Sequence, residues 1–146
     1  TNWQLITMPI SIVQQSFMYQ IMLKLTCQLK AIFTKMELQI VPFNKHVLIV
    51  AGKNSKLTYL ERFETLGEAT EKASANISVE VIAQDGAQVK FAAIDRLGEN
   101  VTTYISRRGR IGRDASIDWA LGIMNEGNVI ADFDSVLDWQ WKSCQP

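Results

Sequence analysis

Four arginines lie within one short stretch, and clustered positive charge of this kind is typical of segments that contact phosphate groups. They are Arg107, Arg108, Arg110 and Arg113, in the run RRGRIGRD. Because Gly109 and Gly112 are free to take positive φ, the run predicts a basic turn from Arg107 to Asp114. Tyr104 is the one aromatic residue beside it, and acidic residues elsewhere cancel a wider basic field. A solvated turn or a partner interface is therefore favoured over nucleic-acid binding.

Four aspartates are candidates for a second kind of chemistry, the paired-carboxylate cleavage of polysaccharides. They are Asp85, Asp95, Asp114 and Asp118. Asp85 and Asp114 coincide with turn signals, where an aspartate side chain hydrogen-bonds nearby backbone. A structural role is therefore favoured over a catalytic pair.

The remaining reactive residues do not form a recognisable site. His46 opens an apolar run, where a hydrogen-bonded structural role is favoured over catalysis. As the single histidine it cannot build a metal site alone, and Cys27 and Cys144 match no zinc or redox spacing. The sequence also lacks a glycine-rich phosphate loop and a nucleophile elbow. It therefore assigns no catalytic, cofactor-binding or metal-ligating residue, and it predicts that the protein is not an enzyme.

Charge and length limit the function classes further. Fifteen basic and fifteen acidic residues among 146 give a net charge of zero, so no global field favours nucleic acid or membrane. The length allows one domain or part of one. Because the chain begins at Thr1, we expect it to be part of a longer product. Gln14, Gln20 and Lys24 interrupt the apolar front, so no membrane span is predicted there.

The elements that must position these residues are strands. Apolar and polar residues alternate with a period of two, or form short apolar runs, between glycine-containing turns. The predicted strands are His46–Ala51, Leu57–Phe63, Ile77–Ile82, Gln88–Asp95, Val101–Ser106, Ala115–Trp119 and Val129–Leu137. The polar stretch from Glu64 to Ala75 predicts a loop with room for one helical turn.

A repeat connects these strands. Ser55–Tyr59, Ala87–Phe91 and Ala115–Trp119 share the order small, polar, aliphatic, polar, aromatic, with offsets of 32 and 28 residues. A second strand follows each copy, and two strands per unit predict a solenoid. The absence of long helical patterns in the repeats favours a β-helix, so the predicted class is all-β. A solenoid cut from its neighbours leaves open sheet edges, so we expect marginal stability and some association.

Residues 1–42 have a different character. Apolar residues recur there at helical spacing, at Ile10, Val13, Phe17, Ile21 and Leu25. This spacing predicts an amphipathic helix from about Ser11 to Lys30.

The middle of the chain resembles a known family. The run VTTYISRRGRIGRDASIDWALGIMNEGN, at Val101–Asn128, is similar to a characteristic segment of the SufB/SufD family of iron–sulfur cluster assembly, and most of all to its SufD branch. HVLIVA at His46–Ala51 and ANISVEVIAQDGAQVKFAAID at Ala75–Asp95 also fit. The resemblance covers residues 43–137.

The resemblance implies a right-handed parallel β-helix and a non-catalytic scaffold subunit in the cytoplasm. It implies SufB-like and SufC-like (ATPase) partners, with the iron–sulfur cluster handled by the whole complex, no cofactor in this part, and no contact with nucleic acid or membrane. The family's partner contacts and cluster-related residues are not matched, so no functional residue is carried over. The residues that match the motif are interpreted as turn, cap and core residues: Gly109, Gly112, Arg113, Asp114 and Trp119.

The two ends do not match the family, and the genetic code suggests a reason. Tryptophan has a single codon, so reading Trp139–Lys142 one base later places glycine at two positions, as in a Gly-x-Gly-Ser turn of the family. In the other shifted frame, Met18–Tyr19 encodes valine and Met36–Glu37 encodes glycine. We therefore predict that residues 1–42 and 138–146 are out-of-frame translation around a SufD-like core, residues 43–137. Cys27, Cys144 and Trp3 would then have no selected role.

The residues are also compatible with two alternatives. A carbohydrate-active β-helix predicts carboxylates that converge on one exposed face. A nucleic-acid-binding solenoid predicts salt-dependent binding through the Arg107–Arg113 turn, lost when Arg107 and Arg108 are both replaced by alanine.

Overall fold

The computed structural model describes residues 4–12, 18–25, 30–38, 43–65 and 72–138, which form ten β-strands. No helix occurs among these described residues. The strands are β1 (Gln4–Ile12), β2 (Met18–Leu25), β3 (Lys30–Leu38), β4 (Phe43–Ala51), β5 (Lys56–Thr65), β6 (Ala73–Ala83), β7 (Gln88–Arg96), β8 (Val101–Ile111), β9 (Ser116–Ile123) and β10 (Val129–Leu137).

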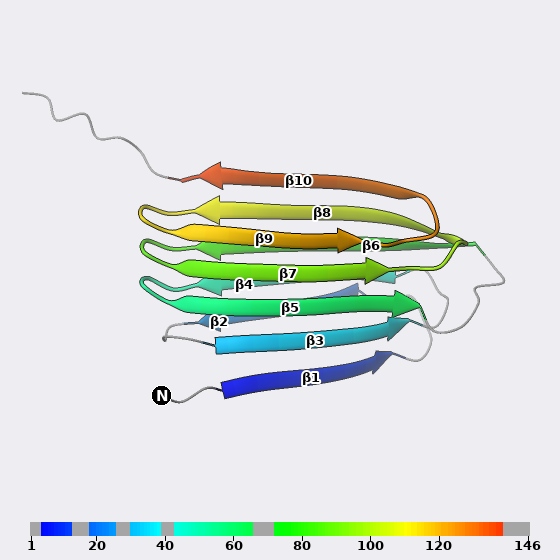
Figure 1. Cartoon of the computed structure of the whole chain (residues 1–146), viewed down its shortest axis with the longest axis horizontal. Helices are drawn as coiled ribbons and strands as arrows, with labels where there is room; N and C mark the ends of the chain where they lie inside the picture. Colours follow the sequence, from blue (N-terminus) through cyan, green and yellow to red (C-terminus); the bar gives the residue numbers. More distant parts are fainter. Residues whose placement is uncertain (1–3, 13–17, 26–29, 39–42, 66–71, 139–146) are drawn as a thin grey trace, which may run out of the picture.

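The strands form two parallel sheets that face each other (Figure 1). Sheet A has the order β1-β3-β5-β7-β9, and sheet B has the order β10-β8-β6-β4-β2. The chain alternates between the sheets, so each consecutive pair of strands makes one rung, and each strand pairs with the strand two places on. The predicted all-β class and parallel β-solenoid are confirmed.

The core lies between the sheets because side chains alternate across each strand. Along β4 the burial changes at every residue, with Val47, Ile49 and Ala51 facing inward. The same alternation continues through β5, β6, β7 and β8. In the last rung, β9 and β10 are more exposed because one edge of each strand has no neighbouring strand among the described residues.

The predicted repeat gives the register of sheet A. Tyr59 pairs with Phe91, and Phe91 pairs with Trp119, at the predicted offsets of 32 and 28 residues. Their ring centroids are 5.1 Å and 4.9 Å apart, within the range of favourable aromatic pairs. These three residues, the aromatic stack, form a continuous column through three rungs of the interior.

Three tight turns stack on one another at one end of the strands. Asn54, Gly86 and Asp114 occupy equivalent places and have φ values of 55°, 70° and 55°. Backbone hydrogen bonds join the layers: Asn54 N–H donates to Asp85 O (2.9 Å) and Gly86 N–H donates to Arg113 O (2.8 Å). Asparagine and aspartate tolerate this φ in two of the turns, and in the third a Cβ on Gly86 would lie 2.1 Å from Asn54 Oδ1, so the close approach favours glycine there.

The prediction that Gly109 and Gly112 use positive φ is wrong, since Asp114 takes that conformation in this turn. Both glycines instead allow close approach. A Cβ on Gly109 would lie 2.9 Å from Ser135 Oγ, and one on Gly112 would lie 2.9 Å from Asp85 N.

The predicted helix from Ser11 to Lys30 is also wrong within the described residues. Met18–Leu25 forms β2, which pairs with β4 along eight residues, from Met18↔Asn44 to Leu25↔Ala51. In this stretch Ile21, Leu23 and Leu25 also recur every second residue, so the sequence fits both periods. Pairing with an existing sheet decides between them, because local propensity is a weak preference that tertiary context overrides.

The loop expected between Glu64 and Ala75 is wrong at both ends, because β5 continues through Thr65 and β6 begins at Ala73. Residues 66–71 of that loop, and Trp3, Cys27 and Cys144, lie outside the described part. In the part of the chain that the structure describes, there is no helix with the length and apolarity needed to cross a membrane.

Candidate functional site: an ion network inside the solenoid

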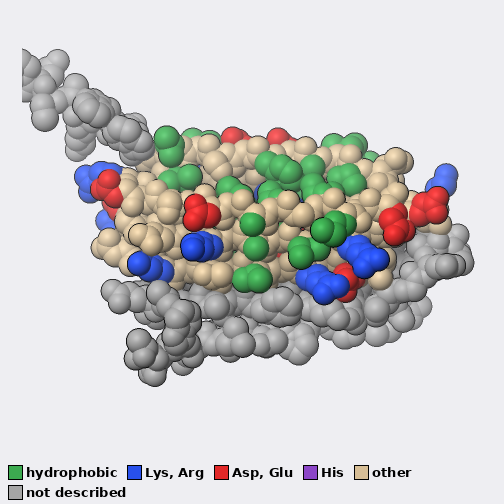
Figure 2. Space-filling view, in the orientation of Figure 1, with side chains coloured by type: hydrophobic (Ala, Val, Ile, Leu, Met, Phe, Trp, Pro, Cys, Tyr) green, Lys and Arg blue, Asp and Glu red, His purple; other side chains and the backbone are tan. Residues whose placement is uncertain are grey.

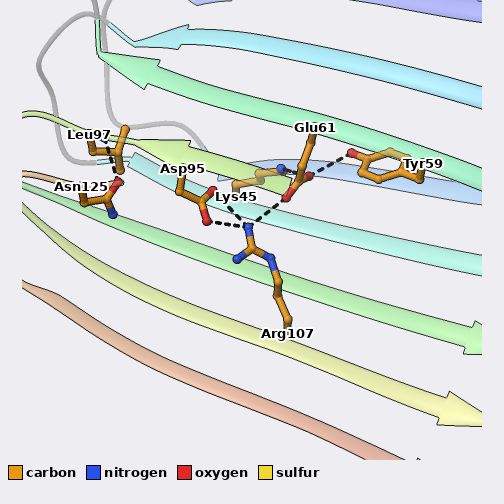
Figure 3. A network of polar contacts seen from close by, with 7 residues as sticks. All are labelled: Lys45, Tyr59, Glu61, Asp95, Leu97, Arg107 and Asn125. Atoms are coloured by element: carbon orange, nitrogen blue, oxygen red, sulfur yellow. Dashed lines mark hydrogen bonds and ion pairs between the residues drawn. The ribbon is translucent and has the colours of Figure 1, made fainter. Parts of the chain in front are cut away.

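Four charged side chains lie inside the solenoid, on strands from both sheets (Figure 3). They are Lys45 on β4, Glu61 on β5, Asp95 on β7 and Arg107 on β8, and the most exposed of them, Glu61, is only 3% accessible. Each faces inward because it falls at a buried position in the alternation of its strand. We refer to these four residues as the ion network.

Arg107 is the centre of the network. Its Nη2 donates to both oxygens of Asp95, at 3.0 and 2.8 Å, and to Oε1 of Glu61, at 3.1 Å. On the other side of Glu61, Lys45 Nζ donates to Oε2 at 2.6 Å, and the Tyr59 hydroxyl donates to the same oxygen at 3.1 Å. Two cations therefore face two anions, and every carboxylate oxygen of the pair accepts at least one charged hydrogen bond.

Aromatic rings surround the cationic ends. The Lys45 Nζ lies 3.6 Å from the ring centroid of Phe63, and the guanidinium carbon of Arg107 lies 6.0 Å from Phe91 and 5.9 Å from Phe133. Such contacts are favourable for desolvated cations. Among the described residues, Nε and Nη1 of Arg107 have no hydrogen-bond partner, so the rings are the surroundings that offset part of their lost hydration.

Burial and pairing compete in setting the pKa of each group. Burial lowers the pKa of Lys45 below its ordinary value, although Glu61 offsets part of that effect. Burial alone would raise the pKa of Glu61, but Lys45 and Arg107 together outweigh it, so this pKa lies below the ordinary value. Burial raises the pKa of Asp95, and Arg107 counteracts it only in part. Glu61, with two cations, is thus the better stabilised of the two anions.

The chemistry available to this arrangement is mutual neutralisation. Both carboxylates are buried, and both are engaged with cations. Within the described residues, no group of three or more histidine, cysteine, aspartate or glutamate side chains is placed to hold a metal ion. The network instead connects β4 and β8 of sheet B to β5 and β7 of sheet A.

The predicted basic turn is wrong in its boundaries. β8 continues through Ile111, and the alternation that begins at Val101 carries on through Arg107, which is 1% exposed. Arg108 and Arg110 point outward, 3.7 Å from Asp132 and 2.8 Å from Asp138 respectively. Only Arg113 lies in the turn, where its backbone N–H donates to Asp85 Oδ1 at 3.1 Å. The four arginines therefore do not present one basic surface.

The four aspartates are not brought together. Asp95 is inside the solenoid, Asp85 and Asp114 are in stacked turns, and Asp118 is on the outer face of β9 beside Lys90. These four aspartates therefore form no convergent pair on an exposed face, which the carbohydrate-active alternative required of them.

His46 lies on the outer face of sheet B, with its Nε2 3.9 Å from Glu80. Two residues of the ion network, Lys45 and Glu61, are not predicted as site residues by the sequence analysis. Their signal was present in the alternation of β4 and β5, which assigns both to inward positions between apolar residues.

Comparison with known proteins connects this solenoid to one family. The family described as "SUF system FeS cluster assembly, SufBD core domain" matches residues 33–145. The chain belongs to the SufBD core-domain family. A curated relative is the iron–sulfur cluster assembly protein SufD of Bacillus subtilis (strain 168), which is 47% identical over 88 residues. No solved structure matches the chain.

The aligned part covers 60% of this chain and 20% of the Bacillus protein, so the chain spans about a fifth of the length of that relative. The family match extends beyond residues 43–137 at both ends. The out-of-frame origin of residues 1–42 and 138–146 stays a prediction, which sequencing of the gene tests.

Proposed function

We propose that this chain is part of a non-catalytic scaffold subunit of a cytoplasmic iron–sulfur cluster assembly complex. The observation that carries the proposal is the family match over residues 33–145, together with the SufD relative. Its proposed partners are a SufB-like subunit and a SufC-like ATPase. The iron–sulfur cluster is the cargo of the whole complex, and this chain would contribute surface and rigidity.

The ion network supports a structural contribution. Its charged groups are buried and bonded to one another across both sheets, an arrangement suited to holding strands in position. Of the four candidate aspartates, Asp95 belongs to this network, Asp85 and Asp114 lie in turns, and Asp118 lies on the outer face of β9. Neither the carbohydrate-active nor the nucleic-acid-binding alternative is supported by these positions.

Co-purification tests the proposal. The 146-residue chain, carrying an affinity tag, is mixed with the SufB-like and SufC-like proteins of the same organism, and the retained proteins are identified. We expect a complex that holds both partners and in which ATP hydrolysis requires the SufC-like subunit. The matched control is an equally tagged SufC-like protein without the chain and without the SufB-like protein.

Two results would contradict the proposal. One is a chain that folds, as shown by a β-rich circular dichroism spectrum, but retains neither partner. The other is hydrolysis of ATP or polysaccharide by the purified chain alone.

A further inference from the structure

The outer face of sheet A contains an apolar groove that the proposed function does not use. The groove runs across β5, β7 and β9 and has a volume of about 620 Å³. The apolar residues that face outward in it are Leu60, Ala92, Ile94, Ala120 and Gly122. We refer to these five residues as the outer groove. Figure 2 shows hydrophobic side chains gathered at the middle of this face, with charged side chains on either side.

The register explains why this face is hollow. Leu60, Ala92 and Ala120 are aligned across the three strands, and Arg62, Ile94 and Gly122 are aligned in the next outward row. Alanine and glycine leave space between Leu60 and Ile94, which are 40% and 42% exposed. The result is a shallow trough that runs along the solenoid axis, across the strands.

Cations flank the trough along the strands. On β7 the outward residues are Lys90, Ala92, Ile94 and Arg96 in order, so the two apolar residues lie between two basic ones. Lys90 and Arg96 are six positions apart along the strand, which corresponds to about 20 Å. Each has an acidic residue at the same register on a neighbouring strand, Asp118 beside Lys90 and Glu64 beside Arg96. Among the described residues neither cation lies within ion-pair distance of a carboxylate, and Glu64 is paired with Arg62. The outward cations of these strands, Lys56, Arg62, Lys90 and Arg96, outnumber the acidic residues Glu64 and Asp118, so the surroundings of the trough have a net positive charge.

The outer face of sheet B is different. Its cations are already close to acidic residues, since Arg108 lies 3.7 Å from Asp132 and Arg110 lies 2.8 Å from Asp138. Both faces expose apolar side chains, including Tyr104 and Ile130 on sheet B, so the two faces are distinguished by their cations, which among the described residues are unpaired only beside the trough of sheet A.

We propose that the outer groove binds an amphipathic helix of a partner protein whose apolar stripe is flanked by acidic side chains. A helix is about 10–12 Å across and repeats every 5.4 Å, while neighbouring strands lie about 4.8 Å apart. A helix laid along the solenoid axis therefore places one apolar side chain near each strand of the trough, and its acidic flanks face Lys90 and Arg96. This is helix-in-groove recognition with complementary charge, and it does not depend on the proposed function.

A pair of designed peptides tests the inference. One is a fluorescent 20-residue helix with a leucine stripe flanked by glutamates, and the other has the same stripe flanked by lysines. We expect the 146-residue chain to bind the glutamate peptide at least tenfold more tightly than the lysine peptide, measured by fluorescence anisotropy. We expect the Lys90→Glu, Arg96→Glu double variant to reverse this preference.

The matched control is the Arg108→Glu, Arg110→Glu double variant, which reverses two cations on the outer face of sheet B. It should leave the affinity for the glutamate peptide unchanged. Thermal unfolding of each variant shows whether it is folded. If the Lys90→Glu, Arg96→Glu variant does not fold, a second pair of variants tests the inference: Ile94→Asp on β7 and, as its control, Tyr104→Asp at a similarly exposed position on β8. Only Ile94→Asp should abolish binding of the glutamate peptide.

The inference is overturned if the two peptides bind equally, if neither binds, or if the sheet A and sheet B variants behave alike. It is also overturned if the chain binds phosphatidylglycerol vesicles through Lys90 and Arg96 but neither peptide, because the face would then recognise a lipid surface.

Discussion

The interior of this solenoid has two parts that are organised in opposite ways. The aromatic stack places similar residues at the same register on successive rungs, so Tyr59, Phe91 and Trp119 form one column. The ion network never repeats: Glu61 is aligned with Ala93, and Arg107 is aligned with Val79. The aromatic stack is stabilised by similar residues on neighbouring rungs. The ion network is stabilised only by complementary charged groups on other strands.

This difference has an energetic meaning. Each ring of the aromatic stack contributes apolar burial that depends little on the identity of distant residues. Each charge of the ion network would be costly alone, because a desolvated ion needs its partner to offset the lost hydration. The two parts should therefore respond differently to single and double substitutions.

The largest effect is expected from Arg107→Ala, which leaves Glu61 with one cation and Asp95 with none. Breaking a buried ion pair from one side typically costs roughly 3–5 kcal/mol, so the free energy of unfolding should fall by about that amount. Urea unfolding followed by circular dichroism measures it. The neighbouring Arg108→Ala, at an exposed position, is the matched control and should change stability by less than about 0.5 kcal/mol. Equal effects of the two variants would show that Arg107 is not a buried partner.

Phe91→Ala should destabilise the aromatic stack by a comparable amount, roughly 3–5 kcal/mol, because it leaves a cavity between Tyr59 and Trp119. The loss should persist when Lys45 and Glu61 are both replaced by apolar residues, since burial of the ring does not require those charges. Urea unfolding in both backgrounds measures this. A loss that vanished in the second background would mean that Phe91 acts through the network.

A smaller effect, a coupling free energy, is expected when Lys45 and Glu61 are replaced together. Lys45→Met leaves Glu61 without its 2.6 Å partner, and Glu61→Leu leaves Lys45 buried without an anion. The double variant removes both, so it should be less destabilised than the sum of the single variants by about 0.5–3 kcal/mol. A double-mutant cycle of unfolding free energies measures the coupling. Additive losses would contradict a paired network.

The smallest effect is the pH dependence that Asp95 contributes. Burial raises its folded pKa above the ordinary value of 3.8, so the folded chain retains this proton more strongly than the unfolded chain. The stability of the wild type relative to Asp95→Asn should therefore fall as the pH rises from 3.8 through the raised pKa, by at most about 1.4 kcal/mol per pH unit.

Urea unfolding of both proteins at several pH values measures that difference. The opposing contribution of Glu61, whose pKa is lowered, is present in both proteins and cancels to first order. A difference that stayed flat or rose with pH would show that Asp95 is not destabilised in its charged form.

The sequence by itself determined the repeat and the class of fold. Alternation with a period of two, and the offsets of 32 and 28 residues, were enough to align Leu57, Val89 and Ile117, and with them the aromatic stack. These features could be predicted because each rung repeats the same local pattern, so local and tertiary preferences agree.

Only the tertiary structure decided where the charges lie. The sequence predicts Arg107 in a turn because Gly109 and Gly112 follow it closely. Its partners are separated from it by 12 and 46 residues along the chain, and Lys45 lies 16 residues before Glu61. Two-residue periodicity reveals which side of a strand a residue faces, but not which distant charge will face it. The winding of the chain places those charges together, so each buried charge has a partner of opposite sign that offsets its lost hydration.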